Sequence, residues 1–105
     1  MNQAEVLKQV RPRLEAAFGD RFRAAILYGS AARGDDQPDS DMDILVLLAP
    51  PVQTLGDIET AVDATYPLQL EIPDRPIHIA VADFKTYEAG QFALYRNVKA
   101  EGVRL

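Results

Sequence analysis

Two aspartates, Asp41 and Asp43, end a dense acidic stretch and introduce a hydrophobic run. Five aspartates lie between positions 35 and 43, and residues 44–48 that follow are all aliphatic. Like charges packed this tightly repel one another unless a cation compensates them. An acidic loop would account for the first three, because aspartate is common in turns. It accounts poorly for Asp41 and Asp43, which lead directly into a predicted strand.

The spacing of Asp41 and Asp43 predicts that both carboxylates point the same way. Side chains on a strand alternate between its two faces, so these two would share a face with Cα atoms about 7 Å apart. Two carboxylates together with substrate phosphates are a common way to hold Mg²⁺. A calcium-binding EF-hand is excluded. If Asp39 took the first position of its loop, Ile44 would occupy the turn-glycine position and Pro50 the position of the bidentate glutamate. We therefore predict Asp41 and Asp43 as Mg²⁺ ligands.

A second candidate for a functional segment is Gly29-Ser30, and ten residues separate it from Asp41. Glycine allows the backbone to approach a phosphate closely, Ser30 adds a hydroxyl donor, and Arg33 adds a cation nearby. Taken alone, a Gly-Ser pair is a turn, Ser30 could merely cap a helix, and Arg33 could pair with Asp35 or Asp36. Combined with the aspartates that open the next strand, the segment predicts phosphate binding by Gly29, Ser30 and Arg33.

A helix is predicted near the N-terminus, ahead of these motifs. Asn2 and Glu5 have the spacing of a capping box, and Gly19 is a plausible C-terminal stop. Pro12 predicts a kink or a division into two short helices. Apolar residues recur at helical spacing through the segment, at Val6, Leu7, Val10, Leu14 and Phe18.

Apolar runs bounded by turn residues indicate the remaining elements. Strands are expected over 24–28, 41–48 and 77–81, with a short edge strand over 68–72. Helices are expected from Thr54, as the cap, to about Tyr66, and over 84–100 with a break near Gly90. This order predicts an α+β fold in which a small mixed sheet is flanked by helices, with residues 1–105 forming one domain. Tyrosines are expected in the core or at interfaces, at positions 28, 66, 87 and 95.

Composition restricts the classes of function. The net charge is −5 without a basic run, which argues against direct nucleic-acid binding. Cysteine is absent, so disulfides, thiolate metal sites and cysteine nucleophiles are excluded. The sequence shows neither a signal peptide nor a run of the roughly 20 apolar residues that spans a bilayer. We therefore expect no membrane association and a cytoplasmic location.

The segment LYGSAARGDDQPDSDMDILVLL, residues 27–48, resembles the signature of the minimal nucleotidyltransferases of the DNA polymerase β superfamily. That signature is Gly-Ser, then Ala-Arg-Gly, then Ser-Asp-x-Asp and a hydrophobic run. The resemblance implies a polymerase-β-like palm and ATP with Mg²⁺ as substrate. It also implies that Gly29 and Ser30 hold the triphosphate, while Asp41 and Asp43 hold the metal ions that activate a hydroxyl against the α-phosphate.

Small members of this family often pair with HEPN-domain proteins in toxin–antitoxin modules. The resemblance therefore implies transfer of AMP from ATP to a hydroxyl of such a partner, with this chain as the antitoxin. A catalytically inactive subunit that binds nucleotide or partner is the alternative. A homo-oligomer is also compatible with the sequence.

His78 stands where the resemblance would place a third carboxylate, on the strand predicted over 77–81. An imidazole can act as a general base near neutral pH, so His78 is a candidate catalytic residue beside Asp41 and Asp43. It is a poor Mg²⁺ ligand, because hard cations prefer oxygen. The alternative is a hydrogen-bonded sheet histidine without chemistry. Glu71 and Asp74 could replace the missing acid only if the backbone brings them close.

Overall fold

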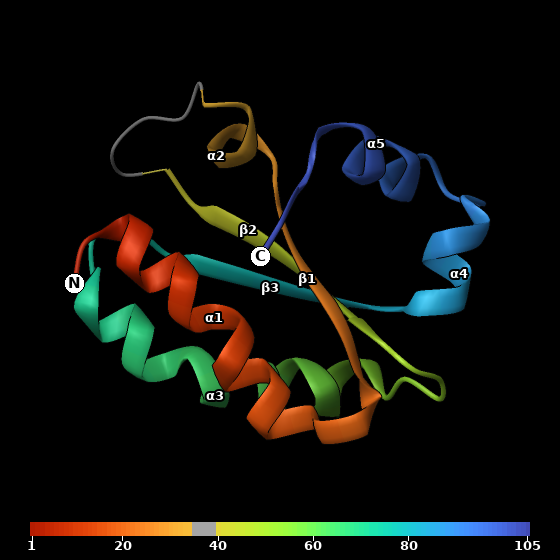
Figure 1. The fold of residues 1–105 in the computed structure, drawn as a ribbon, viewed down its shortest axis with the longest axis horizontal. Helices are drawn as coiled ribbons and strands as arrows, with labels where there is room; N and C mark the ends of the chain where they lie inside the picture. The colour runs from red at the N-terminus through yellow and green to blue at the C-terminus, as the bar shows by residue number, and fades with distance from the viewer. Residues whose placement is uncertain (35–39) are drawn as a thin grey trace.

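A four-stranded mixed sheet with helices on both sides forms the protein (Figure 1). The computed structural model describes residues 1–34 and 40–105. The strand order is β3-β2-β1-β4, in which β1 is antiparallel to β2 and β4, and β2 is parallel to β3. The strands are β1 (Phe22–Tyr28), β2 (Met42–Leu48), β3 (Ile77–Asp83) and β4 (Val103–Arg104). The predicted α+β class with a small mixed sheet is confirmed.

The N-terminal helix α1 (Gln3–Phe18) is one continuous helix. Its start is the predicted capping box, since the Asn2 side chain accepts from the Glu5 N–H at 2.9 Å. The predicted kink or division at Pro12 is wrong. Pro12 lies on the exposed side, where water can solvate the carbonyl that proline leaves unpaired, and the buried side chains of Val10 and Leu14 hold the flanking turns to the sheet. Gly19 ends the helix with φ +57°, and a 3₁₀ turn (Gly19–Arg21) leads into β1.

Helix α3 (Thr54–Glu71) replaces the edge strand predicted over 68–72, which is therefore wrong. The helix passes through Pro67 because Pro67 is exposed, whereas Leu68 is buried in the core. Gln69 fastens its last turn to β3, accepting from the Ile77 N–H at 2.7 Å and donating to the Arg75 carbonyl at 2.9 Å. Thr54 is the first helical residue rather than the cap.

The C-terminal helix is divided near Gly90, as predicted. Helix α4 (Phe84–Ala89) ends at Gly90 in a left-handed conformation, and α5 (Ala93–Glu101) follows. The short strand β4 was not expected from the sequence. It pairs with the C-terminal part of β1, where Leu27 lies opposite Val103, and thereby returns the chain to the sheet.

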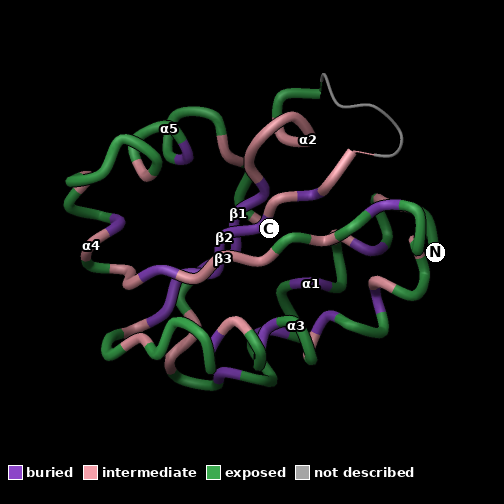
Figure 2. Tube along the Cα trace, turned by 180° about the vertical axis from the view of Figure 1, so that it is seen from behind, coloured by how far each residue is buried: buried purple, intermediate pink, exposed green. Residues whose placement is uncertain are grey.

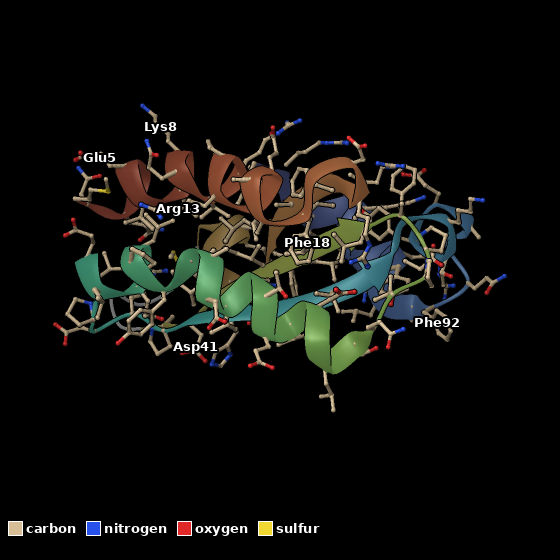
Figure 3. The ribbon with its side chains drawn as sticks, turned by 90° about the horizontal axis from the view of Figure 1, so that it is seen from below. Glu5, Lys8, Arg13, Phe18, Asp41 and Phe92 are labelled. Atoms are coloured by element: carbon tan, nitrogen blue, oxygen red, sulfur yellow. The ribbon has the colours of Figure 1, made fainter. Side chains whose placement is uncertain are left out.

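The two faces of the sheet are covered unequally (Figures 1 and 2). Helices α1 and α3 cover one face with the larger core cluster, and Phe18 lies between them with the sheet behind (Figure 3). On the other face, α4 and α5 cover a smaller cluster that includes Ile26, Leu45 and Leu47. By strand alternation, Asp43 and His78 share this second face. Among the described residues, no helix is long and apolar enough to cross a membrane.

Candidate nucleotide and metal site

Asp43 lies in the sheet between a tyrosine and a histidine. In the strand register it pairs with Tyr28 of β1 on one side and with His78 of β3 on the other. Its side chain is 33% exposed, so it is partly sheltered but reachable from solvent. Asp41 lies immediately before β2, with its side chain 45% exposed. The strand therefore presents both carboxylates beside the part of the second face that carries His78.

His78 contacts both carboxylates. Its Nδ1 lies 3.2 Å from Asp41 Oδ2 and 3.8 Å from Asp43 Oδ1. Two carboxylates that approach one nitrogen lie on the same side of the strand, as their spacing predicts. A proton on Nδ1 would be held by Asp41, which leaves Nε2 as the ring nitrogen that can accept a proton.

Gly29 brings the two motifs into direct contact. Its φ is +76°, a conformation that side-chain-bearing residues rarely adopt, and a Cβ built on it would lie 2.7 Å from Asp43 Oδ2. Ser30 begins the short helix α2 (Ser30–Arg33), with Gly29 rather than Ser30 in the capping position. The close approach of backbone and carboxylate therefore depends on glycine at this position.

Arg33 of α2 forms an ion pair with α5. Its Nη1 lies 3.4 Å from Glu101 Oε2, and both side chains are about half exposed. The pairing considered from the sequence, with Asp35 or Asp36, lies outside the described residues. Glu101 was not singled out in the sequence, because a contact spanning 68 positions leaves no local pattern.

The surroundings shift the acidity of two groups in the site. Burial raises the pKa of the Asp43 carboxyl above its usual range; the charge of His78 lowers it, and that of Asp41 raises it. Burial, and then the charge of Asp43, raises the pKa of the Tyr28 hydroxyl. Tyr28 was expected in the core or at an interface; it is half-buried, packs against the smaller core cluster and lies beside Asp43 in the strand register. Its alternation with Ala24 and Ile26 was the signal that could have indicated this face.

The donor set around Asp43 fits a cation that retains water and phosphate ligands. Within residues 1–34 and 40–105, no group of three or more His, Cys, Asp or Glu side chains is arranged to hold a metal ion. Two carboxylates alone would form a partial shell, the kind that Mg²⁺ completes with water and substrate phosphates. Glu71 and Asp74 do not complete it. They line a separate cavity with Gln3, and Glu71 Oε2 lies 3.8 Å from the N-terminal amine.

Solved structures of known proteins share this fold. Spectinomycin adenyltransferase from Enterococcus faecialis, determined with ATP and spectinomycin, superposes with a TM-score of 0.64 at 21% identity, over 86% of this chain and 36% of that one. A toxin–antitoxin structure with AMP-PNP gives 0.63 at 18% identity, covering 92% and 70%. A mutant of the toxin–antitoxin MntA-HpeT gives 0.61 at 21% identity, covering 100% and 72%. The sheet and its helices thus form a polymerase-β-like nucleotidyltransferase fold.

Two putative protein adenylyltransferases of Methanocaldococcus jannaschii are related in sequence. One is 38% identical over 47 residues, which are 45% of this chain and 47% of the relative. The other is 35% identical over 48 residues, covering 46% and 48%. The matches thus span about half the length of each relative. The nucleotidyltransferase domain family matches far more of the chain, from residue 7 to residue 103, and the chain belongs to this family.

Proposed function

We propose that this nucleotidyltransferase domain transfers AMP from ATP, with Mg²⁺, to a hydroxyl of a partner protein. The observation that carries the proposal is the cluster of Asp41, Asp43 and His78, with Gly29 packed against Asp43. A partly exposed carboxylate pair next to a glycine turn is suited to a phosphate-bound cation. The sequence relatives support protein as the acceptor, since they are named putative protein adenylyltransferases.

The reaction would be an in-line displacement at the α-phosphorus of ATP. The acceptor oxygen forms a bond to that phosphorus, the bond to the bridging oxygen of the β-phosphate breaks, and pyrophosphate leaves. Asp41 and Asp43 would hold Mg²⁺, which when bound neutralises phosphate charge and stabilises the attacking and leaving oxygens. Gly29 and Ser30 would hold the triphosphate, with Arg33 as an additional cation.

His78 would receive the proton of the attacking hydroxyl. With Nδ1 directed at Asp41, Nε2 is the ring nitrogen left to accept it. The alternative function is a subunit that binds nucleotide or partner without turnover, having no third carboxylate at this place. The contact of the imidazole with both carboxylates supports a catalytic role for His78, and a hydrogen-bonded sheet histidine without chemistry is the alternative role.

The partner belongs to the same proposal. The toxin–antitoxin structures that share this fold support a two-protein system, in which this chain would be the antitoxin of a HEPN-domain toxin in the cytoplasm. In this proposal the partner would supply the acceptor hydroxyl and complete the site. The neighbouring reading frame is the first place to look for it.

The test is transfer of label from ATP carrying a labelled α-phosphate to the HEPN-domain protein, with Mg²⁺. We expect Asp41→Asn/Asp43→Asn to lower transfer about a hundredfold or more, since metal stabilisation of the transition state contributes several kcal/mol. Asp63→Asn, on the exposed side of α3, is the matched control and should transfer normally. Partner binding without any transfer, unchanged in the double variant, would establish the non-catalytic alternative.

A further inference from the structure

We infer that the cavity between α2 and α5 receives the base of the nucleotide, and that Asn97 selects a 6-aminopurine there. The inference rests on the proposed function and adds to it the part of the site that recognises the base. The cavity has a volume of about 200 Å³. Its walls come from the end of β1, from α2 and from α5, through Tyr28, Gly29, Arg33, Leu94, Asn97 and Glu101, with Val98 beneath.

The cavity adjoins the carboxylate site directly. Tyr28 and Gly29 both line it. Tyr28 pairs with Asp43 in the register of β1 and β2, and the backbone of Gly29 lies close to the Asp43 carboxylate. A triphosphate held at Gly29 and Ser30 would therefore have the remainder of its nucleotide within reach of this cavity. A volume of 200 Å³ is below the roughly 300–1,000 Å³ of whole-ligand pockets, so it suits one ring system rather than an entire nucleotide.

The lining has the chemistry of a base site. Leu94 is 52% exposed although it is aliphatic, and Val98 lies buried beneath it. With the Tyr28 ring, these side chains offer apolar and aromatic surface to the faces of a planar heterocycle. An exposed leucine at the mouth of a cavity would lose contact with water when such a ring covered it.

Asn97 offers the polar contact that can distinguish bases. Its side chain forms no hydrogen bond with any described residue, so both its N–H groups and its carbonyl are available. An amide presents a donor beside an acceptor, which complements the amino group and adjacent ring nitrogen of adenine. A carboxylate in its place would present two acceptors, which suit the N1–H and 2-amino group of guanine.

The pair formed by Arg33 and Glu101 closes one side of the cavity. It joins α2 to α5 at 3.4 Å, so the α2 wall of the cavity carries a cation and the α5 wall a carboxylate. A phosphate group is thereby disfavoured deep in the cavity beside Glu101, and an uncharged ring is favoured.

The experiment measures binding of Mg²⁺-ATP, Mg²⁺-GTP and Mg²⁺-tripolyphosphate by calorimetry to the complete chain and three variants. The wild type should prefer ATP to GTP. Asn97→Leu should weaken ATP about tenfold and leave tripolyphosphate unchanged, and Asn97→Asp should shift the ratio of ATP to GTP affinity toward GTP by about tenfold or more. Gln91→Glu makes the same amide-to-acid change outside the cavity and should alter no affinity.

The outcomes separate this inference from the proposed function. If ATP and tripolyphosphate bind equally well and neither Asn97 variant changes the ATP-to-GTP ratio, the cavity does not hold the base, although the phosphate site stands. If Asn97→Asp weakens all three ligands alike, its effect is general charge repulsion and the inference is overturned. If the wild type binds none of the three, the proposed function fails as well. Because Asn97 is exposed, its substitution should not destabilise the fold. Thermal unfolding of each variant checks that it is folded.

Discussion

Gly29 and Asp43 lie fourteen positions apart in the sequence, yet they are in close contact in the folded chain. The carboxylate of Asp43 occupies the position that a side chain on Gly29 would need. Gly29 also has a backbone conformation, φ +76° with ψ −156°, that is almost restricted to glycine. Backbone shape and carboxylate position at this site are therefore determined together.

Gly29→Ala should accordingly damage the site more than the fold. We expect a loss of stability of about 1–3 kcal/mol from backbone strain. Because the new methyl group must displace the Asp43 carboxylate, we also expect Mg²⁺-nucleotide affinity to fall about tenfold or more. Calorimetry and thermal unfolding measure the two effects.

Gly34→Ala is the control for that prediction. Gly34 also has a positive φ, of +78°, but no described atom lies within 4 Å of a Cβ added there. This variant should lose some stability and keep its nucleotide affinity. Equal affinity losses in the two variants would show that strain, rather than displacement of Asp43, is responsible.

His78→Asp tests whether the histidine limits the metal site. The substitution places a third carboxylate opposite Asp43 in the register of β2 and β3. Because Mg²⁺ prefers oxygen ligands, we expect its affinity to rise about tenfold, as measured by calorimetry with a non-hydrolysable ATP analogue. His78→Asn adds a neutral oxygen of similar size and should give a smaller gain. Unchanged affinity in His78→Asp would place residue 78 outside the metal's reach.

At the scale of elements, one ion pair holds the start of α3 against the turn before β1. The Nη1 and Nη2 groups of the Arg21 guanidinium donate to the Asp57 carboxylate, at 3.0 and 2.7 Å, and Asp57 also accepts from the Gln53 N–H at 2.9 Å. Asp57 is 6% exposed. The hydrogen bond from Arg21 lowers the pKa of the Asp57 carboxyl, against the opposing effect of burial.

Asp57→Asn should therefore destabilise the fold at neutral pH and much less in acid. Because the folded-state pKa lies below the unfolded value near 3.9, the unfolded chain takes up the proton first as the pH falls. The contribution of Asp57 is complete above about pH 4 and is lost as the pH falls through its folded-state pKa. We expect a cost of about 1–3 kcal/mol at pH 7.

Urea unfolding of both proteins at pH 7 and at pH 3 measures this dependence. The difference in free energy of unfolding between wild type and Asp57→Asn should shrink at the lower pH. Asp20→Asn changes an exposed aspartate in the neighbouring turn. Its free energy of unfolding should differ little from that of the wild type at either pH. A constant difference for Asp57→Asn would mean that the ion pair does not carry the pH dependence.

Elements with a local signal were predictable from the sequence. The Asn2 capping box, the break at Gly90 and the aliphatic strand after Asp43 depend on neighbours a few positions away. The errors arose where distant packing decided the outcome. Residues 68–71 extend α3 because Leu68 is buried against the sheet and Gln69 bonds to β3, and β4 exists only because β1 offers a free edge.

The candidate site divides in the same way. Gly29, Asp41 and Asp43 were identifiable because residue type and spacing carry their chemistry. The contacts of His78 with both aspartates depend on β3 lying parallel to β2 in one particular register, which single-strand patterns do not specify. Tyr28, Asn97 and Glu101 become neighbours only when α5 folds back beside α2.

At the scale of the whole molecule, the larger hydrophobic core and the candidate site lie on opposite faces of the sheet. The larger core lies between the sheet and the pair α1 and α3, while the candidate site lies on the face that α4 and α5 cover in part. Substitutions in the larger core should therefore act on folding, and substitutions in the site should act on binding.

Leu14→Ala compared with Leu55→Ala tests this division. Leu14 of α1 is completely buried, whereas Leu55 of α3 is 83% exposed. The buried substitution should cost about 2–5 kcal/mol, a large part of the 5–15 kcal/mol expected for a domain. The exposed one should stay within about 0.5 kcal/mol. Chemical denaturation gives both values, and similar losses would contradict the assignment of the core.

The contact between Gly29 and Asp43 also has a consequence for sequence variation among relatives. A lineage that keeps the carboxylate at position 43 cannot substitute the glycine without disturbing it, whereas a lineage that has replaced the carboxylate by a smaller residue loses that clash and meets only the backbone strain at φ +76°. Substitution at position 29 should therefore be found mainly in lineages that have also changed position 43. Relatives in which both have changed would be those released from selection for nucleotide transfer, and this paired substitution would identify them from sequence alone.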